Sequence, residues 1–185
     1  MALTKTPVCD FGKKAEDFKL KSIENKIISL NDVKGEKATL IMFICNHCPY
    51  VKAIIRDLAK DCNELKKDGI NSVAIMSNDT KNYPEDSFDN MIKFAKTNNF
   101  GEINYLIDET QEIARKYGAV CTPDFFGYNK ELKLQYRGRF RELKDLKPVS
   151  GGDSDLKVAM KMISETQAGP KEQIPSMGCN IKWFN

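Results

Sequence analysis

The sequence predicts a three-layer α/β sandwich in which helices cover both faces of a mixed central sheet. Short continuous apolar runs are typical of buried strands, and longer stretches with helical spacing separate them. Two apolar runs late in the chain have the form of a hairpin, which adds antiparallel strands to a parallel core. No internal repeat or long linker interrupts the 185 residues, so we expect one domain over residues 1–185.

The first half of the chain supplies an N-terminal hairpin, two buried strands and a helix. Turn residues surround short apolar pairs in residues 25–37, which predicts an edge strand or hairpin followed by a loop. Residues 38–45 (ATLIMFIC) and 70–77 (INSVAIMS) are apolar runs typical of strands buried on both faces. Between them, residues from about 49 to 67 place apolar side chains at helical spacing, and Asp68-Gly69 ends this helix.

The second half adds three helices, one more strand and the closing hairpin. Residues 84–99 begin with a proline and acidic residues, which favour a helix start, and keep apolar side chains on one face. Residues 103–108 predict a short strand, and residues 109–118 a helix closed by glycine. Residues 124–138 have the pattern of a hairpin, and residues 152–167 that of a final helix.

The C-terminal region is the least regular part of the sequence. The final helix has either Asp153 or Ser154 as its N-cap, since both residue types accept bonds from free backbone N–H groups. Residues 168–185 show no clear period. We therefore expect a C-terminal tail that lies over the domain or extends from it.

Charge and hydropathy argue against two classes of partner. Lys and Arg alternate with Asp and Glu, and the net charge is only +3. The sequence therefore has no basic block of the kind that binds nucleic acid or an anionic membrane. The longest strongly apolar run is too short to span a bilayer, and the N-terminus lacks the pattern of a secretory signal. We expect a cytoplasmic protein. In a reducing compartment, closely spaced cysteines indicate redox catalysis or metal binding rather than a disulfide framework.

Two of the six cysteines and the single histidine lie in the segment CNHCPYV, residues 45–51. Cys48 stands where the predicted strand meets the helix, and Pro49 takes the favoured first helical position. Free N–H groups at a helix N-terminus stabilise a thiolate, which is the nucleophilic form of cysteine. Cys45 lies three residues earlier, and a Cys-x-x-Cys pair after a strand–helix pattern is typical of redox centres. The alternative is that Cys45 is an inert buried sulfur.

Several segments resemble the thioredoxin-like superfamily, and within it the AhpC/TSA (redoxin) group. Residues 15–20 resemble its first strand, and residues 28–49 its hairpin and active-site strand. Residues 117–140 resemble its cis-proline loop and closing hairpin. CNHCPYV, DETQEIARKYGAVCTPDFF and PSMGCNIKW together resemble one narrower thioredoxin-like subfamily. The resemblance implies a thioredoxin-like fold and an oxidoreductase that works through thiols, with no cofactor.

The resemblance assigns the role of nucleophile to Cys48, which lies where thioredoxins place their first active-site cysteine. The position of thioredoxin's second cysteine corresponds to Val51, so the pair is shifted to the other side of the nucleophile. In peroxiredoxins the residue three before the reactive cysteine is Thr or Ser, and Cys45 fills that position here. By this likeness, Cys45 is close enough to resolve an oxidised Cys48 as a disulfide.

The sequence also departs from both patterns. Peroxiredoxins carry a proline where this chain has Ile41, and an arginine near the cis-proline loop, where TPDFF has none. Arg137 and Arg139 follow too late to correspond. Thioredoxin's buried aspartate corresponds to Met42, so proton transfer must use another group.

Four further residues are candidates for the site. Thr122-Pro123 resembles the cis-proline loop, which faces the nucleophile and offers the backbone of Thr122 to an extended thiol substrate. Cys121 either lies near the active site or points into the core. Cys179 either folds back as a resolving or regulatory thiol or is an exposed bystander.

The remaining candidates are a histidine and two cysteines. His47 occupies the place of the tryptophan beside thioredoxin's nucleophile, which implies partial exposure; it either tunes the thiolate or is structural. Cys62 continues the apolar stripe of its predicted helix and belongs to the core. Cys9 has no partner in view and no assigned role.

The leading hypothesis is a thiol–disulfide oxidoreductase. The Cys48 thiolate attacks a disulfide or is oxidised to a sulfenic acid, and Cys45 closes the intramolecular disulfide. Its substrates are protein or small-molecule disulfides or peroxides, and thioredoxin or glutathione is the expected reductant. One alternative is a peroxiredoxin-like thiol peroxidase that uses Cys48. The other is a module that binds Cu or Zn through Cys45, His47 and Cys48, although it lacks the distal histidine of the copper-chaperone branch of this fold.

Overall fold

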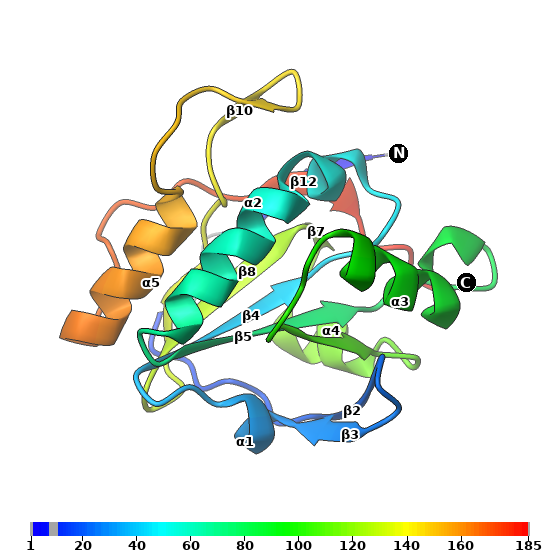
Figure 1. Ribbon diagram of the computed structural model, residues 1–185, viewed down its shortest axis with the longest axis horizontal. Helices are drawn as coiled ribbons and strands as arrows, with labels where there is room; N and C mark the ends of the chain where they lie inside the picture. Colours follow the sequence, from blue (N-terminus) through cyan, green and yellow to red (C-terminus); the bar gives the residue numbers. More distant parts are fainter. Residues whose placement is uncertain (1, 8–10, 185) are drawn as a thin grey trace.

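The computed structural model describes residues 2–7 and 11–184; Cys9 lies outside them. Figure 1 shows a central sheet between helices, the three-layer α/β arrangement that the sequence predicts. The seven-stranded sheet has the order β3-β2-β6-β5-β4-β8-β9. Its strands are β2 (Lys19–Ser22), β3 (Ile27–Ser29), β4 (Ala38–Phe43), β5 (Ile70–Met76), β6 (Asn104–Ile107), β8 (Asp124–Asn129) and β9 (Leu134–Tyr136).

Helices cover both faces of this sheet in the part of the chain that the structure describes (Figure 1). One face carries α2 (Pro49–Lys66), α3 (Phe88–Thr97) and α5 (Asp155–Thr166). The opposite face carries the shorter helices α1 (Leu30–Val33) and α4 (Glu112–Tyr117). None of the helices formed by the described residues has both the length and the apolar character needed to cross a bilayer.

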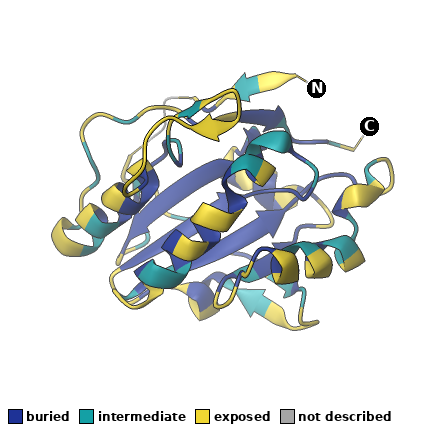
Figure 2. Cartoon of the chain, turned by 45° about the horizontal axis from the view of Figure 1, so that its top comes forward, coloured by how far each residue is buried: buried dark blue, intermediate teal, exposed yellow. Residues whose placement is uncertain are grey.

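Strand β4 lies at the centre of the sheet, parallel to β5 and antiparallel to β8. All its residues are buried, because helices cover both of its faces (Figure 2). Successive side chains of a strand point to opposite faces, so Leu40 and Met42 join the core beneath α2 and α5. Ile41 and Phe43 join the core beneath α1 and α4. This packing on both sides fixes the point at which β4 ends and the chain turns toward α2.

The structure defines the first residues of two helices more precisely than the sequence pattern does. The predicted helix over residues 84–99 is a short 3₁₀ turn, η1 (Pro84–Asp86), followed by α3. The Ser87 side chain accepts a backbone N–H bond and caps α3, so the helix begins after it. At the start of α5 the N-cap is Ser154 rather than Asp153.

The predicted C-terminal tail contains a strand that the sequence pattern did not indicate. Strand β12 (Met177–Asn180) pairs antiparallel with β1 (Leu3–Lys5) on one side and β7 (Cys121–Thr122) on the other. A segment of this length is too short to establish a period, and both partners are distant in sequence. A further hairpin of β10 (Leu143–Lys144) and β11 (Lys147–Pro148) projects at the top of Figure 1.

A buried ion pair fixes the loop between α4 and β8. The carboxylate of Asp124 accepts bonds from Arg137, with Oδ1 3.3 Å from Nε and Oδ2 3.0 Å from Nη2. Asp124 also accepts the N–H of Val120, and Arg137 donates to the carbonyl of Gly118. Burial raises the pKa of Asp124, and the facing guanidinium opposes that rise. Arg137 thus ties the start of β8 to the end of α4.

Replacing Arg137 should destabilise the fold strongly. Arg137→Met leaves the Asp124 carboxylate buried without its partner, and breaking a buried pair in this way costs about 3–5 kcal/mol. Chemical denaturation monitored by circular dichroism measures the loss. Arg56→Met on the exposed side of α2 is the matched control and should change the unfolding free energy by less than about 0.5 kcal/mol. Equal effects of the two variants would contradict a structural role for the pair.

Candidate redox site

The site is built at the junction between β4 and α2. Cys48 is the N-cap of α2, and Pro49 follows at the first helical position, as the sequence predicts. The Cys48 side chain makes no capping hydrogen bond in this geometry, but the backbone N–H of Val51, the third helical residue, is close enough to help lower the pKa of Cys48. A sulfur in this position faces the free N–H groups and the positive end of the helix dipole. The fold therefore favours a thiolate at Cys48.

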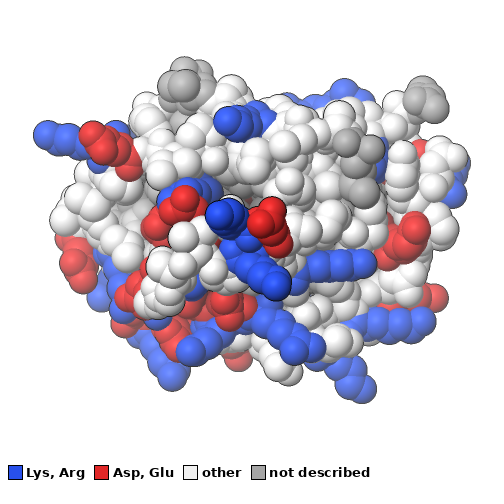
Figure 3. Space-filling model, turned by 90° about the horizontal axis from the view of Figure 1, so that it is seen from above, with Lys and Arg blue, Asp and Glu red and all other residues white. Residues whose placement is uncertain are grey.

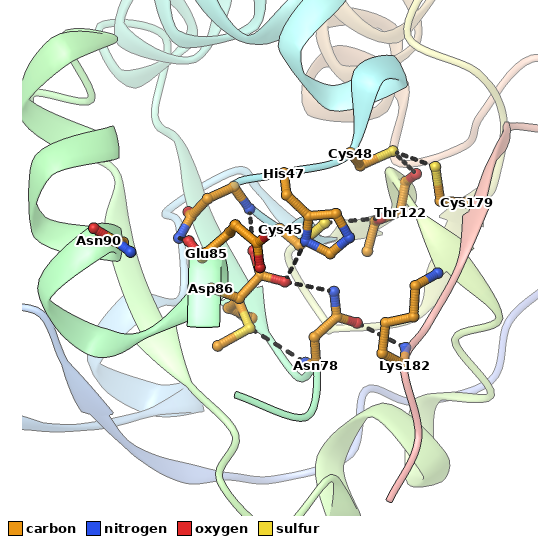
Figure 4. A network of polar contacts seen from close by, with 12 residues as sticks. Cys45, His47, Cys48, Asn78, Glu85, Asp86, Asn90, Thr122, Cys179 and Lys182 are labelled. Carbon is orange, nitrogen blue, oxygen red and sulfur yellow. Dashed lines mark hydrogen bonds and ion pairs between the residues drawn. The ribbon is translucent and has the colours of Figure 1, made fainter. Parts of the chain in front are cut away.

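Three thiols and one loop meet at this point (Figure 4). The Sγ atom of Cys48 lies 3.0 Å from Sγ of Cys179 and 3.1 Å from the carbonyl oxygen of Thr122. The Sγ atom of Cys45 lies 3.3 Å from Oγ1 of Thr122. All three cysteines are buried free thiols, and the Thr122-Pro123 bond is cis, which confirms the sequence prediction for this loop. The structure thus brings Cys179 to the site, where the sequence left its position open.

Contacts among the three thiols lower the pKa of one of them and raise the pKa of the other two. A hydrogen bond from Cys45 is the main cause that lowers the pKa of Cys48 to about 5, with further help from Cys179. The bond to Cys48, together with burial, raises the pKa of Cys45 well above its usual range. Burial, and then Cys48, raise the pKa of Cys179 to about 12. The Thr122 carbonyl accepts a bond only from a protonated Cys48, so this contact opposes ionisation. The result is one thiolate between two thiol donors.

These shifts come from near contacts rather than from a long-range field. Basic and acidic side chains stand side by side over much of the face in Figure 3. The net charge is only +3, and the opposite charges are interspersed. Their electric fields therefore largely cancel beyond short distances.

A second network holds His47 beside the sulfur atoms (Figure 4). Its Nδ1 lies 2.7 Å from Oδ2 of Asp86, which is fully buried. Asp86 also accepts bonds of 2.8 Å from the N–H of Asn46 and from Nδ2 of Asn78. The ring of Tyr83 stacks on the imidazole with centroids 5.6 Å apart. The carboxylate raises the pKa of His47, and its charge adds to the rise in the pKa of Cys45.

Asp86 is the site residue that sequence reasoning missed. Its acidic neighbourhood resembles an ordinary helix start, and nothing in the sequence links it to the cysteine motif. In the structure it places a buried carboxylate near Cys45. This is the kind of group that the chain lacks at Met42, where thioredoxins have their aspartate.

Two other cysteines make no hydrogen bond to the three thiols of the site. The Sγ atom of Cys121 contacts the carbonyl of Pro123 at 3.5 Å and is completely buried, and burial raises its pKa. Cys121 thus points into the interior, and it also lies close enough to Cys48 and Cys179 for their charges to add to the rise in its pKa. Cys62 is buried in the core beneath α2, as predicted, and burial raises its pKa to about 12.

Cys45, His47 and Asp86 place ligand atoms within 4.8 Å of one another, so they form a group that could hold a metal ion. This group differs from the predicted soft-metal set, because a carboxylate replaces the Cys48 sulfur. His47 Nδ1 and Asp86 already bond to each other, and Asp86 accepts two further bonds. A metal ion would have to break these contacts, which argues for a positioning network.

The sheet and the cysteine site together have the form of a redoxin. A thioredoxin-like sheet with a cysteine at a strand–helix junction, facing a cis-proline, is the arrangement of a redoxin. The AhpC/TSA family matches residues 11–139, well over half of the chain. The chain belongs to the AhpC/TSA family.

Two solved structures share the fold over nearly the whole chain. An uncharacterized conserved protein from Geobacillus kaustophilus is 39% identical, with a TM-score of 0.94, over 100% of this chain and 97% of that one. A hypothetical protein from Sinorhizobium meliloti 1021 is 36% identical, with a TM-score of 0.90, over 98% of each chain. The thioredoxin domain of a thiol-disulfide oxidoreductase from Bacteroides vulgatus shares the fold alone, at 19% identity and a TM-score of 0.59, over 70% of this chain and 89% of that one. A search of curated proteins finds no match.

The pKa of His47 tests the second network. Because Asp86 stabilises the imidazolium, the pKa of His47 should exceed its usual value of about 6.5 and should fall in Asp86→Asn. The stabilisation by this pair is complete below the usual pKa and is lost as the pH rises through the raised one. The chain has a single histidine, so one-dimensional proton NMR follows it directly. Glu85→Gln removes an exposed neighbouring charge and is the control; equal shifts in both variants would refute the assignment.

Proposed function

We propose that the protein is a thiol–disulfide oxidoreductase in which Cys48 is the attacking thiolate and Cys45 the resolving thiol. The observation that carries this proposal is the placement of Cys48 as the N-cap of α2, where its sulfur faces the free N–H groups of the first turn and lies 3.1 Å from the carbonyl oxygen of Thr122. The Cys45 thiol lowers the pKa of Cys48 to about 5, while the pKa of Cys45 itself is raised, so Cys48 is the thiol that we expect to be ionised at neutral pH. A ready nucleophile beside a protonated second thiol suits the two steps of disulfide exchange.

The chemistry needs no group outside the site except the substrate and a reductant. The Cys48 thiolate attacks one sulfur of a substrate disulfide, forms a mixed disulfide and expels the other sulfur as a thiolate. Cys45 then loses its proton to solvent or to the leaving group and attacks Sγ of Cys48. This forms a Cys45–Cys48 disulfide and releases the second substrate thiolate. Two electrons have passed from the protein dithiol to the substrate, and an external dithiol returns them.

The proposal extends to partners and compartment. Disulfides of proteins or small molecules are the substrates, and thioredoxin or glutathione is the reductant. A protein that depends on free thiols suits the reducing cytoplasm, which we propose as its location.

Membership of the AhpC/TSA family favours a peroxidase as the second candidate. In that reaction the peroxide oxidises Cys48 to a sulfenic acid, and Cys45 condenses with it and releases water. The ion pairs of Arg137 and Arg139 do not favour this reaction. Arg137 pairs with Asp124, and Nε of Arg139 lies 2.6 Å from Asp155. Both guanidinium groups are thus paired with carboxylates. We therefore place disulfide exchange first.

A chromogenic disulfide separates the two steps of the proposed reaction. With 2,2′-dithiodipyridine, attack and resolution each release one thiopyridone, which absorbance follows in a stopped-flow instrument. The wild-type protein should release two in rapid succession, and Cys48→Ser should lose both rapid phases. Cys45→Ser should keep the first release but should not form the Cys45–Cys48 disulfide, which peptide mass spectrometry should detect in the wild-type protein.

Cys62→Ala is the control, since this thiol is buried in the core and should leave both phases unchanged. A rapid first release that survives in Cys48→Ser would overturn the assignment of the nucleophile. If hydrogen peroxide oxidises Cys48 faster than the disulfide does, the peroxidase becomes the leading function.

A further inference from the structure

The C-terminal strand β12 lies against the cis-proline loop and brings a third thiol to the Cys48 sulfur. Its Cys179 stands opposite Thr122 in the antiparallel register with β7. The Sγ atoms of Cys179 and Cys48 are 3.0 Å apart (Figure 4). A disulfide has an S–S distance of about 2.05 Å, so these atoms are about 1 Å from bonding distance.

Strand β12 takes the place that the sequence predicts for an extended thiol substrate. The backbone of Thr122 is expected to pair with such a substrate, but the chain's own strand pairs there instead. With β12 in this position, Cys48 is 0% exposed and Cys179 4% exposed. The C-terminal segment therefore occupies the backbone edge of Thr122, where a substrate was expected to pair as an added strand. The same segment places Cys179 beside the nucleophile.

The fit of β12 to the loop depends on a glycine. A Cβ atom on Gly178 would lie 2.0 Å from the carbonyl oxygen of Thr122 and 3.1 Å from Cδ of Pro123. No side chain can occupy that space without moving one of the two backbones. The residue next to Cys179 is thus the one that permits close approach.

Contacts on both sides of β12 hold it in place. The Ser176 hydroxyl donates to the carbonyl of Pro123 at 2.8 Å. The N–H of Lys182 donates to Oδ1 of Asn78 at 2.9 Å, and its carbonyl accepts Nε2 of Gln111 at 2.8 Å. The second edge of β12 pairs with β1. Cys179 is therefore presented by a strand that is anchored before and after it.

We propose that β12 is a tethered, substrate-like strand and that Cys179 is a third exchanging thiol, which forms a reversible disulfide with Cys48. This inference rests on the proposed function, because it requires Cys48 to be the nucleophile. It adds an internal partner that is chemically equivalent to a substrate thiol.

The first exchange completes the transfer of two electrons from the chain to the substrate, and the second only moves the disulfide within the chain. When Cys48 carries a mixed disulfide with a substrate, the Cys179 thiol loses its proton to the departing thiolate and attacks Sγ of Cys48. The substrate leaves as a thiol, and a Cys48–Cys179 disulfide forms. The Cys45 thiol can then attack Sγ of Cys48, which forms the Cys45–Cys48 disulfide and returns Cys179 to a thiol. The second exchange moves the disulfide without net oxidation or reduction.

Replacing Cys45, which competes for the same sulfur, isolates the contribution of Cys179 to the second release. Full-length Cys45→Ser is treated with 2,2′-dithiodipyridine, and the second release of thiopyridone is compared with that of Cys45→Ser/Cys179→Ser. The single variant should show the faster second release by about tenfold or more, because a tethered thiol acts at high effective concentration. Peptide mass spectrometry of the single variant should identify a Cys48–Cys179 disulfide, and the double variant should retain the Cys48 mixed disulfide.

A second pair of variants tests the strand itself without altering a thiol. Gly178→Ala in the Cys45→Ser background should reduce the second release to the rate of the double variant, because the added Cβ forces β12 away from Thr122. Gly151→Ala is the matched control, since a Cβ there meets no atom within 4 Å, and should leave the rate unchanged.

The outcomes distinguish this inference from the proposed function. A rapid first release with no Cys48–Cys179 disulfide, and equal second releases in the single and double variants, overturns the role of Cys179 alone. Loss of the first release in every variant with Cys48 intact overturns the proposed function as well. If Gly178→Ala fails to fold, the comparison of Cys45→Ser with its Cys179→Ser partner still decides the question.

Discussion

The structure depends on the contact between the N-terminus of α2 and the backbone of Thr122. The pairing of β4 with β8 places Phe43 opposite Asp124, so the end of β4 lies level with the cis-proline loop. The chain then turns and presents Cys48 as the N-cap of α2. Its sulfur meets the Thr122 carbonyl at 3.1 Å. The position of the reactive atom is thus set by strand register and by the start of a helix, both of which are rigid features.

The surroundings of this contact determine the charge state of each thiol. Burial alone raises a thiol pKa, because it penalises the thiolate. At Cys48 this penalty is outweighed by donors from Cys45, Cys179 and the backbone, which lower its pKa to about 5. The same bonds and burial keep the other two thiols protonated. Asp86 adds a buried negative charge on the far side of Cys45 and binds His47. The same contacts therefore favour the thiolate at Cys48 and the protonated thiols at Cys45 and Cys179.

Local patterns in the sequence were sufficient for the layers of the fold and for Cys48. The apolar run that ends at the motif predicts a buried strand, and Pro49 marks the helix start. The cis bond before Pro123 followed only from the family resemblance, and the structure has it. Asp86 and strand β12 could not be predicted, because their roles come from contacts across the fold. Asp86 meets His47 from 39 positions away, and Cys179 meets Cys48 from 131 positions away.

The ionisation of the Cys48 thiol can be followed by a thiolate titration. The ultraviolet absorbance of thiolates, recorded for the reduced protein minus reduced Cys48→Ser, reports the ionisation of this one sulfur across the pH range. The account predicts a transition with a midpoint near the pKa of about 5, with the thiolate fully formed at neutral pH. A transition that begins only near the usual thiol pKa of about 8.5 would contradict it, because the donors around Cys48 would then not stabilise its thiolate.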